Sequence, residues 1–287
     1  MEKITYLIAN HDHSKYIRTC IESLNKQTSD RWLCIICDDA SNDNSVEIIS
    51  AYLNENVNLI RNDKNFGYIE TLKRLIREAD TNIVGILDAD DALFPEATTS
   101  MLDIYDKNKR AEFVHSRLRL FDETLTMPKG TLGKAVDPKK TSIRSGFITK
   151  LFTFRKSAYK RTGGLDNEYL FAEDRDLTLK LEEVTVPIFL NKILYKYRVI
   201  PDSQSHDSEK REVGLVNHIK AKKEALRRRK ITGLDKIMHE QIMNLDYIEW
   251  SNRYSKFTIW LAIYFRRILW AIDMRLKIRS NGELRRF

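Results

Sequence analysis

The chain contains few of the residues that break or cross-link a fold. Its 287 residues include 3 cysteines, 10 glycines and 5 prolines. Three cysteines are too few for a disulfide framework, and an odd number fits a reducing compartment. Scarce glycine and proline, together with 42% hydrophobic residues, exclude collagen-like, low-complexity and disordered chains. The composition is that of a globular protein with a substantial core.

Long apolar runs are also lacking. No uncharged hydrophobic stretch approaches the roughly 20 residues that span a bilayer. The first residues, MEKITYLIANHDHSKY, have no cationic start followed by a long apolar stretch, so we expect no cleaved signal peptide. These absences predict a cytoplasmic protein, either soluble or peripheral on the cytoplasmic face of the inner membrane.

Three sequence fingerprints of common enzyme classes are missing. The chain has no Gly-x-Gly-x-x-Gly motif and no phosphate-binding loop ending in Gly-Lys-Ser/Thr, which argues against a dehydrogenase and a P-loop NTPase. It also lacks the Gly-x-Ser-x-Gly elbow of serine hydrolases.

Positive charge is confined to the end of the chain. Residues 210–287 hold 19 Lys and Arg against 8 Asp and Glu, whereas residues 1–209 hold 30 against 33. A basic appendage on a slightly acidic body differs from a uniformly basic nucleic-acid binder. Any single basic run is equally explained as a solvated helix face.

The first 90 residues alternate between strand and helix patterns. Short apolar runs predict strands at 3–9, 32–37, 57–61 and 82–87. Helical spacing covers 16–27 and 45–54, and a third helix follows Asn65-Phe66-Gly67. This alternation predicts a mostly parallel α/β sheet flanked by helices. Ligands of such sheets bind at the carboxyl ends of the strands, where this chain has Asp, Asn and His.

The later part of the chain divides into a body and a helical extension. Strands are predicted at 111–121, 147–154 and 187–199, a helix at 176–184, and a loop around the site at 123–144. From about residue 213 the pattern is helical with almost no Gly or Pro. We therefore predict a catalytic domain at 1–212 and a basic, amphipathic helical region at 213–287.

Two aspartates, Asp88 and Asp90, follow the fourth predicted strand. Alternate residues of an extended segment point the same way, so both carboxylates can face one site. Such a pair suits a hard divalent cation, Mg²⁺ or Mn²⁺, with open positions for phosphate oxygens. The alternative is that these loop aspartates, with Asp91, cap the next helix.

Further carboxylates stand at comparable positions. Asp39 follows the second strand and can accept a hydrogen bond from a nucleotide base or ribose, or else cap a helix. Glu173 and Asp174 stand before a helix, where a general base and a simple helix-start carboxylate are both open interpretations.

Taken together, these motifs resemble the GT-A core of family 2 glycosyltransferases. The resemblance covers residues 1 to about 207. It rests on AlaAsnHisAsp at 9–12, CDDASND at 37–43, Asn65-x-Gly67, LDADDALFP at 87–95, GGLDNEYLFAEDRDLTLKL at 163–181, and Tyr197-Arg198 followed by DSQSH at 202–206.

The resemblance implies a role for each matching residue. Nucleotide binding falls to Ala9, Asn10, His11, Asp39 and Asp88. Metal binding, to Mn²⁺ or Mg²⁺, falls to Asp90 and His206. Asp174 corresponds to the catalytic base, with Glu173 and Arg198 in supporting positions.

The implied reaction is a single displacement. Asp174 would take a proton from an acceptor hydroxyl as that hydroxyl attacks the anomeric carbon, inverting its configuration. The donor would be a nucleotide-diphosphate sugar, with UDP favoured. The acceptor would be a glycan or a polyprenyl-linked glycan in surface polysaccharide synthesis.

The end of the chain predicts an amphipathic helix. One side carries Phe257, Leu261, Tyr264, Phe265, Ile268 and Ile272, and the other carries Arg266, Asp273 and Lys277. Such a helix suits a membrane surface with anionic lipid. It equally suits packing on the catalytic domain or on a second subunit in a homodimer.

Three other functions fit parts of the sequence. A catalytically idle GT-A-like protein that binds a glycan or a partner would keep the fold without turnover. A nucleic-acid binder would use the ALRRRK run at 225–230, although the body's charge gives it little support. A sugar-1-phosphate nucleotidyltransferase would need a glycine-rich basic loop near the N-terminus, which NHDHSK is not.

Overall fold

The computed structural model describes residues 1–136, 141–144, 148–200 and 208–233, together with 236–237, 239–241, 243–244, 263–265 and 268. The chain forms two compact units. The first comprises residues 1–167 and 177–206, and the second comprises residues 168–176 and 207–287. The predicted boundary after residue 212 stays a prediction.

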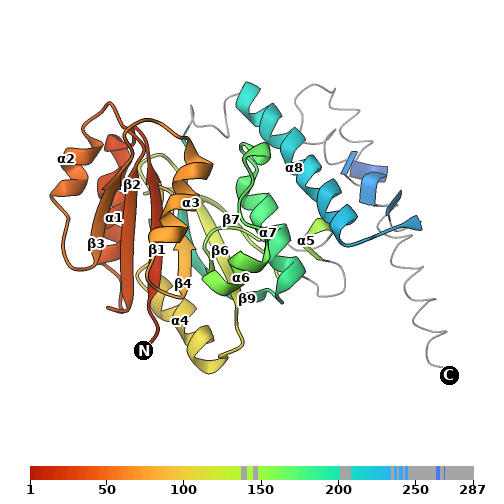
Figure 1. The fold of residues 1–287 in the computed structure, drawn as a ribbon, viewed down its shortest axis with the longest axis horizontal. Helices are drawn as coiled ribbons and strands as arrows, with labels where there is room; N and C mark the ends of the chain where they lie inside the picture. Colours follow the sequence, from red (N-terminus) through yellow and green to blue (C-terminus); the bar gives the residue numbers. More distant parts are fainter. Residues whose placement is uncertain are drawn as a thin grey trace. The chain divides into compact units, whose positions relative to one another are not determined.

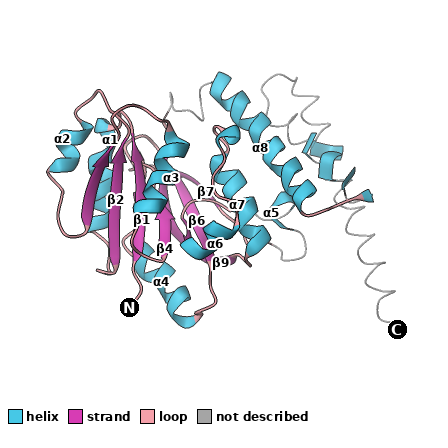
Figure 2. Cartoon of the chain, in the orientation of Figure 1, coloured by secondary structure: helices cyan, strands magenta, loops and turns pink. Residues whose placement is uncertain are grey.

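The first unit is built on one mixed sheet. Within the described residues its strand order is β3-β2-β1-β4-β8-β6-β9-β5, with β7 beside β6 (Figures 1 and 2). The strands are β1 (Ile4–Asn10), β2 (Trp32–Asp38), β3 (Val57–Arg61), β4 (Ile83–Ile86), β5 (Ala92–Leu93), β6 (Phe113–Phe121), β7 (Pro128–Leu132), β8 (Phe152–Arg155) and β9 (Ile188–Arg198). Strands β3, β2, β1 and β4 are parallel neighbours, and β8 runs antiparallel to β4 and β6. The predicted mostly parallel sheet is confirmed.

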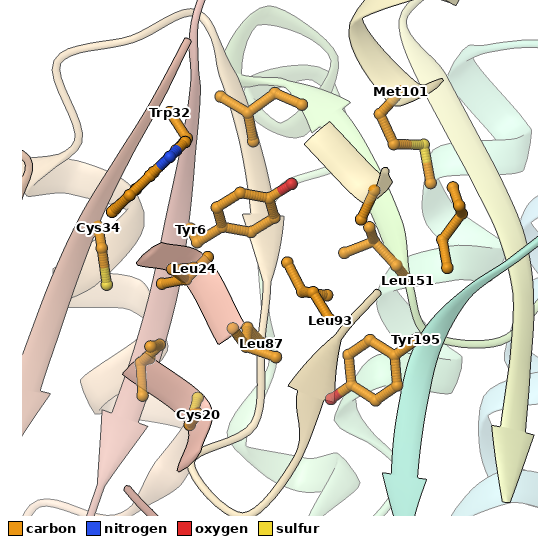
Figure 3. Packing of buried hydrophobic residues seen from close by; sticks show 14 of the residues in the cluster. Tyr6, Cys20, Leu24, Trp32, Cys34, Leu87, Leu93, Met101, Leu151 and Tyr195 are labelled. Carbon is orange, nitrogen blue, oxygen red and sulfur yellow. The ribbon is translucent and has the colours of Figure 1, made fainter. Parts of the chain in front are cut away.

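Helices cover both faces of this sheet. One buried cluster joins the strands to α1 (Ser14–Asn25), α2 (Ser45–Ser50) and α4 (Ala97–Lys107). A second cluster joins them to α3 (Tyr68–Glu78), α6 (Lys156–Arg161) and α7 (Glu173–Val184). Figure 3 shows the first cluster, in which Tyr6, Leu87 and Tyr195 lie among apolar side chains. These two layers fix the strand ends on which the site is built.

One expectation about the elements was wrong, and the alternative that Asp91 caps a helix directly after it is excluded. The segment predicted as a loop at 123–144 contains β7 and the short helix α5 (Thr141–Arg144). Within the described ranges, strand β7 pairs with β6 alone and is mostly exposed, so its sequence carries little of the apolar alternation that marks a strand. The residues after Asp91 form strand β5 instead of a helix, because Ala92 and Leu93 pair with β9.

The second unit contains α8 (Ser208–Arg228). None of the helices in the described ranges combines the length and apolar character needed to cross a bilayer. Nearly all of the amphipathic helix predicted between 257 and 277 lies outside the described residues.

Candidate functional site

Three neighbouring strand ends bring the first group of predicted residues together. Strand β1 lies between β2 and β4, and all three are parallel. The backbone N–H of Asp39 donates to the carbonyl of Asn10 (2.8 Å), which ties the end of β2 to the end of β1. Ala9 and Asn10 end β1, and Asp88 follows β4 by two residues. The polar residues therefore collect at the carboxyl edge, as the sequence predicts.

Asp39 organises the turn that begins α3. Its carboxylate accepts hydrogen bonds from Asn62 Nδ2 (2.6 Å) and from the backbone N–H groups of Phe66 (2.9 Å) and Gly67 (2.8 Å). Gly67 has φ +86°, a conformation that favours glycine. The residue before α2 is Asn44, and the first N–H group of that helix, at Ser45, donates to Oδ1 of Asp43 (2.9 Å). Asp39 is therefore not the cap of α2.

His11 lies against the same turn. Its Nδ1 is 2.9 Å from the carbonyl oxygen of Asp39, and its Nε2 is 3.0 Å from Nδ2 of Asn65. A carbonyl only accepts, so Nδ1 donates to Asp39. The side chain remains 37% exposed. These two contacts hold the ring in a fixed orientation beside Asp39.

Asn10 has a largely structural set of contacts. Its Nδ2 donates to Asp38 Oδ1 (2.8 Å) and to Ser41 Oγ (3.1 Å), which joins β1 to the loop after β2. The side chain is buried, and its Oδ1 has no hydrogen-bond partner among the described residues. Ala9 is half-buried and packs beside the second apolar cluster.

Asp88 is held by three side chains. Oδ1 accepts from the hydroxyl of Tyr68 (2.8 Å), and Oδ2 accepts from Lys150 Nζ (2.5 Å) and from the Tyr195 hydroxyl (3.4 Å). Burial alone would raise the pKa of Asp88, but the Lys150 charge, together with the hydrogen bonds from Lys150 and Tyr68, outweighs burial, so that the pKa is lowered. Asp88 is therefore a fixed carboxylate next to a cation.

Asp90 has the opposite environment. Among the described residues, no other residue donates a hydrogen bond to its carboxylate. Burial and the nearby charge of Asp88 raise the pKa of Asp90, while His13 acts to lower it. A carboxylate in this state has oxygen atoms available and gains from a nearby cation. Asp90 thus fits the predicted metal ligand.

The rest of the predicted metal site is not in view. His206 lies outside the described residues. Within the described ranges, no group of three or more His, Cys, Asp or Glu side chains is arranged to hold a metal ion. Of the two predicted metal ligands, Asp90 and His206, the described residues include only Asp90.

Arg198 fastens the turn that carries these aspartates. Its backbone N–H donates to Asp91 Oδ1 (2.7 Å), and its Nε donates to the Asp90 carbonyl (2.5 Å). Nη1 donates to the carbonyl of Glu123, and the guanidinium lies 4.7 Å from the centre of the Tyr16 ring. The alternative role of Asp91 as a helix cap is wrong. Its buried carboxylate instead ties the turn to the end of β9.

Glu173 and Asp174 open α7. Both lie in its first turn, where negative charge is favoured by the helix dipole. Residues 168–176 belong to the second unit, together with α8. Asp174 is half-buried. Its position is compatible both with a general base and with a carboxylate that only stabilises the start of the helix.

Several residues of the Asp88 environment were missed by sequence reasoning. Lys150, Tyr68 and Tyr195 come from β8, α3 and β9 regions that are far apart in the chain. None stands in a recognisable motif. Only the pairing of β4 with β8 indicates Lys150, and that pairing is a property of the folded sheet.

Comparison with known proteins identifies the family. The model of glycosyl transferase family 2 matches residues 5–163, more than half of the chain. The chain belongs to glycosyl transferase family 2. This confirms the predicted family and, with it, the class of transferase enzymes.

A curated relative supports the same family. Chondroitin synthase of Escherichia coli is 30% identical over 247 residues, which cover 85% of this chain and 35% of that relative. The chain spans about a third or less of the length of the first curated relatives that it matches.

Solved structures support the fold. S. aureus TarS in complex with UDP-GlcNAc has a TM-score of 0.61 and 16% identity, covering 87% of this chain and 81% of that one. A mannosyltransferase from Pyrobaculum calidifontis, in complex with GDP-Man and Mn²⁺, has a TM-score of 0.61 and 16% identity, covering 96% and 80%. The predicted GT-A fold is confirmed.

Proposed function

We propose that this chain is an inverting glycosyltransferase that moves a sugar from a nucleotide-diphosphate donor to a hydroxyl group. A UDP-sugar is the favoured donor. The acceptor is a glycan or a lipid-linked glycan in surface polysaccharide synthesis. One observation carries the proposal: Asp39, Asp88 and Asp90 follow parallel strands at one sheet edge, and the Asp90 carboxylate accepts no hydrogen bond from another described residue.

The donor's nucleoside would meet the β1 and β2 ends. His11 offers a ring face beside Asp39 on which a base could stack. The Asp39 carboxylate is a hydrogen-bond acceptor, and the imide N–H of a uracil base would donate to it. Asp88 would accept from a ribose hydroxyl while Lys150 keeps it charged. Ala9 and Asn10 supply the backbone that leads into this group. UDP-GlcNAc in the TarS complex favours a UDP-linked donor by analogy of fold.

A divalent cation, Mn²⁺ or Mg²⁺, would be held by Asp90 with His206. When bound, it would neutralise charge on the departing diphosphate. The mannosyltransferase complex contains Mn²⁺, which supports this choice for a related fold. Arg198 would keep the Asp90 turn in place through its hydrogen bond to the Asp90 carbonyl.

Asp174 would act as the general base. It would accept the proton of the acceptor hydroxyl as the new glycosidic bond forms and the bond to the diphosphate breaks. Glu173 supports the same helix start. One base suffices because a single displacement needs no covalent intermediate, unlike the two-carboxylate retaining hydrolases.

The acceptor and the location extend the proposal. The basic surplus after residue 209 suits attraction to an anionic lipid surface, and so to a polyprenyl-linked acceptor at the cytoplasmic face of the membrane. A homodimer through the C-terminal helices is the other use of that region.

The donor site is tested by calorimetric titration with a panel of nucleotide sugars, with and without Mn²⁺. We expect one donor to bind wild type more tightly with Mn²⁺, and Asp90→Ala to lose that gain. Asp103→Ala, on the half-exposed surface of α4, is the matched control. Failure of every nucleotide sugar to bind would overturn the proposal. Binding without turnover for any acceptor would favour the idle GT-A-like binding protein.

A further inference from the structure

The segment just before Asp174 makes a sharp turn. The 3-10 helix Asn167–Tyr169 ends there, and the N–H of Ala172 donates to the carbonyl of Tyr169 (2.8 Å). Phe171, between them and α7, has φ +63°, a left-handed conformation that is uncommon for a bulky residue. Such a conformation persists only when its surroundings hold it. The turn therefore depends on what packs against it.

Helix α8 supplies that packing through two residues. The α-carbon of Gly214 lies so close to the turn that an added Cβ would be 3.2 Å from both Cβ and the carbonyl oxygen of Phe171. Three residues later, Asn217 Nδ2 donates to the carbonyl of Leu170 (2.8 Å). Residues three apart share one face of a helix. This face of α8 therefore contacts the two residues that form the turn.

A third contact on α8 is weaker. Lys220 Nζ lies 2.7 Å from Oε2 of Glu168, and 5.5 Å from the centre of the Tyr169 ring. Both charged side chains are at least half exposed, so this ion pair contributes little. The close approach at Gly214 and the Asn217 hydrogen bond fix the geometry.

His218 on α8 also senses the charge of Asp174. It follows Asn217 and interacts electrostatically with Asp174, and the cationic groups facing it are Arg175 and Lys222. Burial lowers the pKa of His218 to about 4, although the Asp174 charge acts in the opposite direction.

We propose that α8 is a positioning helix for the base: Gly214 and Asn217 hold the Phe171 turn, and the turn sets the orientation of Asp174. The inference rests on the proposed function, because it needs Asp174 to act on the acceptor. It gives the start of the C-terminal region a part in the reaction step. Gly214 and Asn217 are positioning residues and touch no substrate.

The test compares Gly214→Ala, Asn217→Leu and the control Val216→Ala. Val216 is 48% exposed and stands on the same helix between the two positioning residues. The assay measures nucleoside diphosphate release from the donor that wild type turns over, with kcat, donor KM and Tm. We expect kcat to fall about 10- to 100-fold in both positioning variants, with donor KM and Tm near wild type, because misplacing one reacting group costs rate and not donor affinity. Val216→Ala should behave as wild type.

Several outcomes would overturn the inference. Unchanged kcat in Asn217→Leu would do so, even if Gly214→Ala fails to fold. If the fall in kcat is accompanied by a higher donor KM and a lower Tm, α8 only stabilises the fold. Asp174→Asn is assayed in parallel. If it keeps wild-type turnover, the proposed base is wrong; if it alone loses turnover, the base stands and the role of α8 is rejected.

Discussion

Lys150 Nζ lies 2.5 Å from Oδ2 of Asp88, and the two side chains are only 13% and 19% exposed. The β4–β8 register explains the pairing. Ile83 lies opposite Arg155 and Gly85 opposite Thr153, so the same register, continued beyond the strands, brings Lys150 opposite Asp88. The Lys150 ammonium group thus stands beside the first aspartate of the Asp-x-Asp motif.

Loss of this cation should weaken donor binding. Lys150→Met leaves the charge of Asp88 uncompensated where a diphosphate must approach, so the donor Kd should rise at least about tenfold, or about 1.4 kcal/mol. Lys150→Arg should retain most of the affinity. The exposed Lys129 on β7 gives the control Lys129→Met. Calorimetry measures all three, and a Kd for Lys150→Met equal to that of the control would contradict the role.

Asp39→Asn should cost stability as well as affinity. The amide has one acceptor oxygen, whereas the carboxylate accepts from Asn62, Phe66 and Gly67. An N–H group would then face a backbone N–H, at a cost of about 1–3 kcal/mol. Thermal unfolding should show a lower Tm than for Asp63→Asn, an exposed control on the neighbouring loop. Equal Tm values for the two variants would refute this account of the turn.

Asp90→Asn should raise stability while removing the metal response. Burial and the charge of Asp88 disfavour the ionised Asp90, so a neutral side chain relieves repulsion. We expect Tm to rise by about 2–4 °C. Mn²⁺ should no longer tighten donor binding. A variant that is less stable than wild type and still responds to Mn²⁺ would be inconsistent with the site.

His115 predicts a pH-dependent stability. Its side chain is fully buried, neither ring nitrogen has a partner among the described residues, and burial lowers the pKa of His115 to about 4. In the unfolded chain His115 binds a proton below about pH 6.5, whereas in the folded chain it stays neutral until about pH 4. The free energy of unfolding therefore falls as pH drops from about 6.5 towards 4.

His115→Leu should remove this contribution. As pH falls, the free energy of unfolding of the variant should increase relative to that of wild type, by up to about 3 kcal/mol near pH 4. Urea unfolding at pH 7 and pH 5 measures the difference. His218 has a pKa shift in the same direction and keeps part of the slope in both proteins. Parallel pH profiles for the two proteins would rule out His115 as the source.

The sequence predicts the first four strands because each is a short apolar run that ends in polar residues. It also predicts Asp39, Asp88 and Asp90 at the strand ends, since parallel strands share one edge. It misses α4, whose first turn is Ala-Thr-Thr-Ser, and β7, whose residues are mostly exposed. Lys150 is missed for a different reason: its place beside Asp88 depends on strand pairing, which no local pattern encodes.

The central claim is best tested by measuring nucleoside diphosphate release and donor binding together, for wild type and Asp174→Asn. Wild type should release the diphosphate in the presence of Mn²⁺ or Mg²⁺. Asp174→Asn should bind the donor with wild-type affinity and release at least about 100-fold less, because it lacks only the base. Release at the wild-type rate by Asp174→Asn would contradict the account.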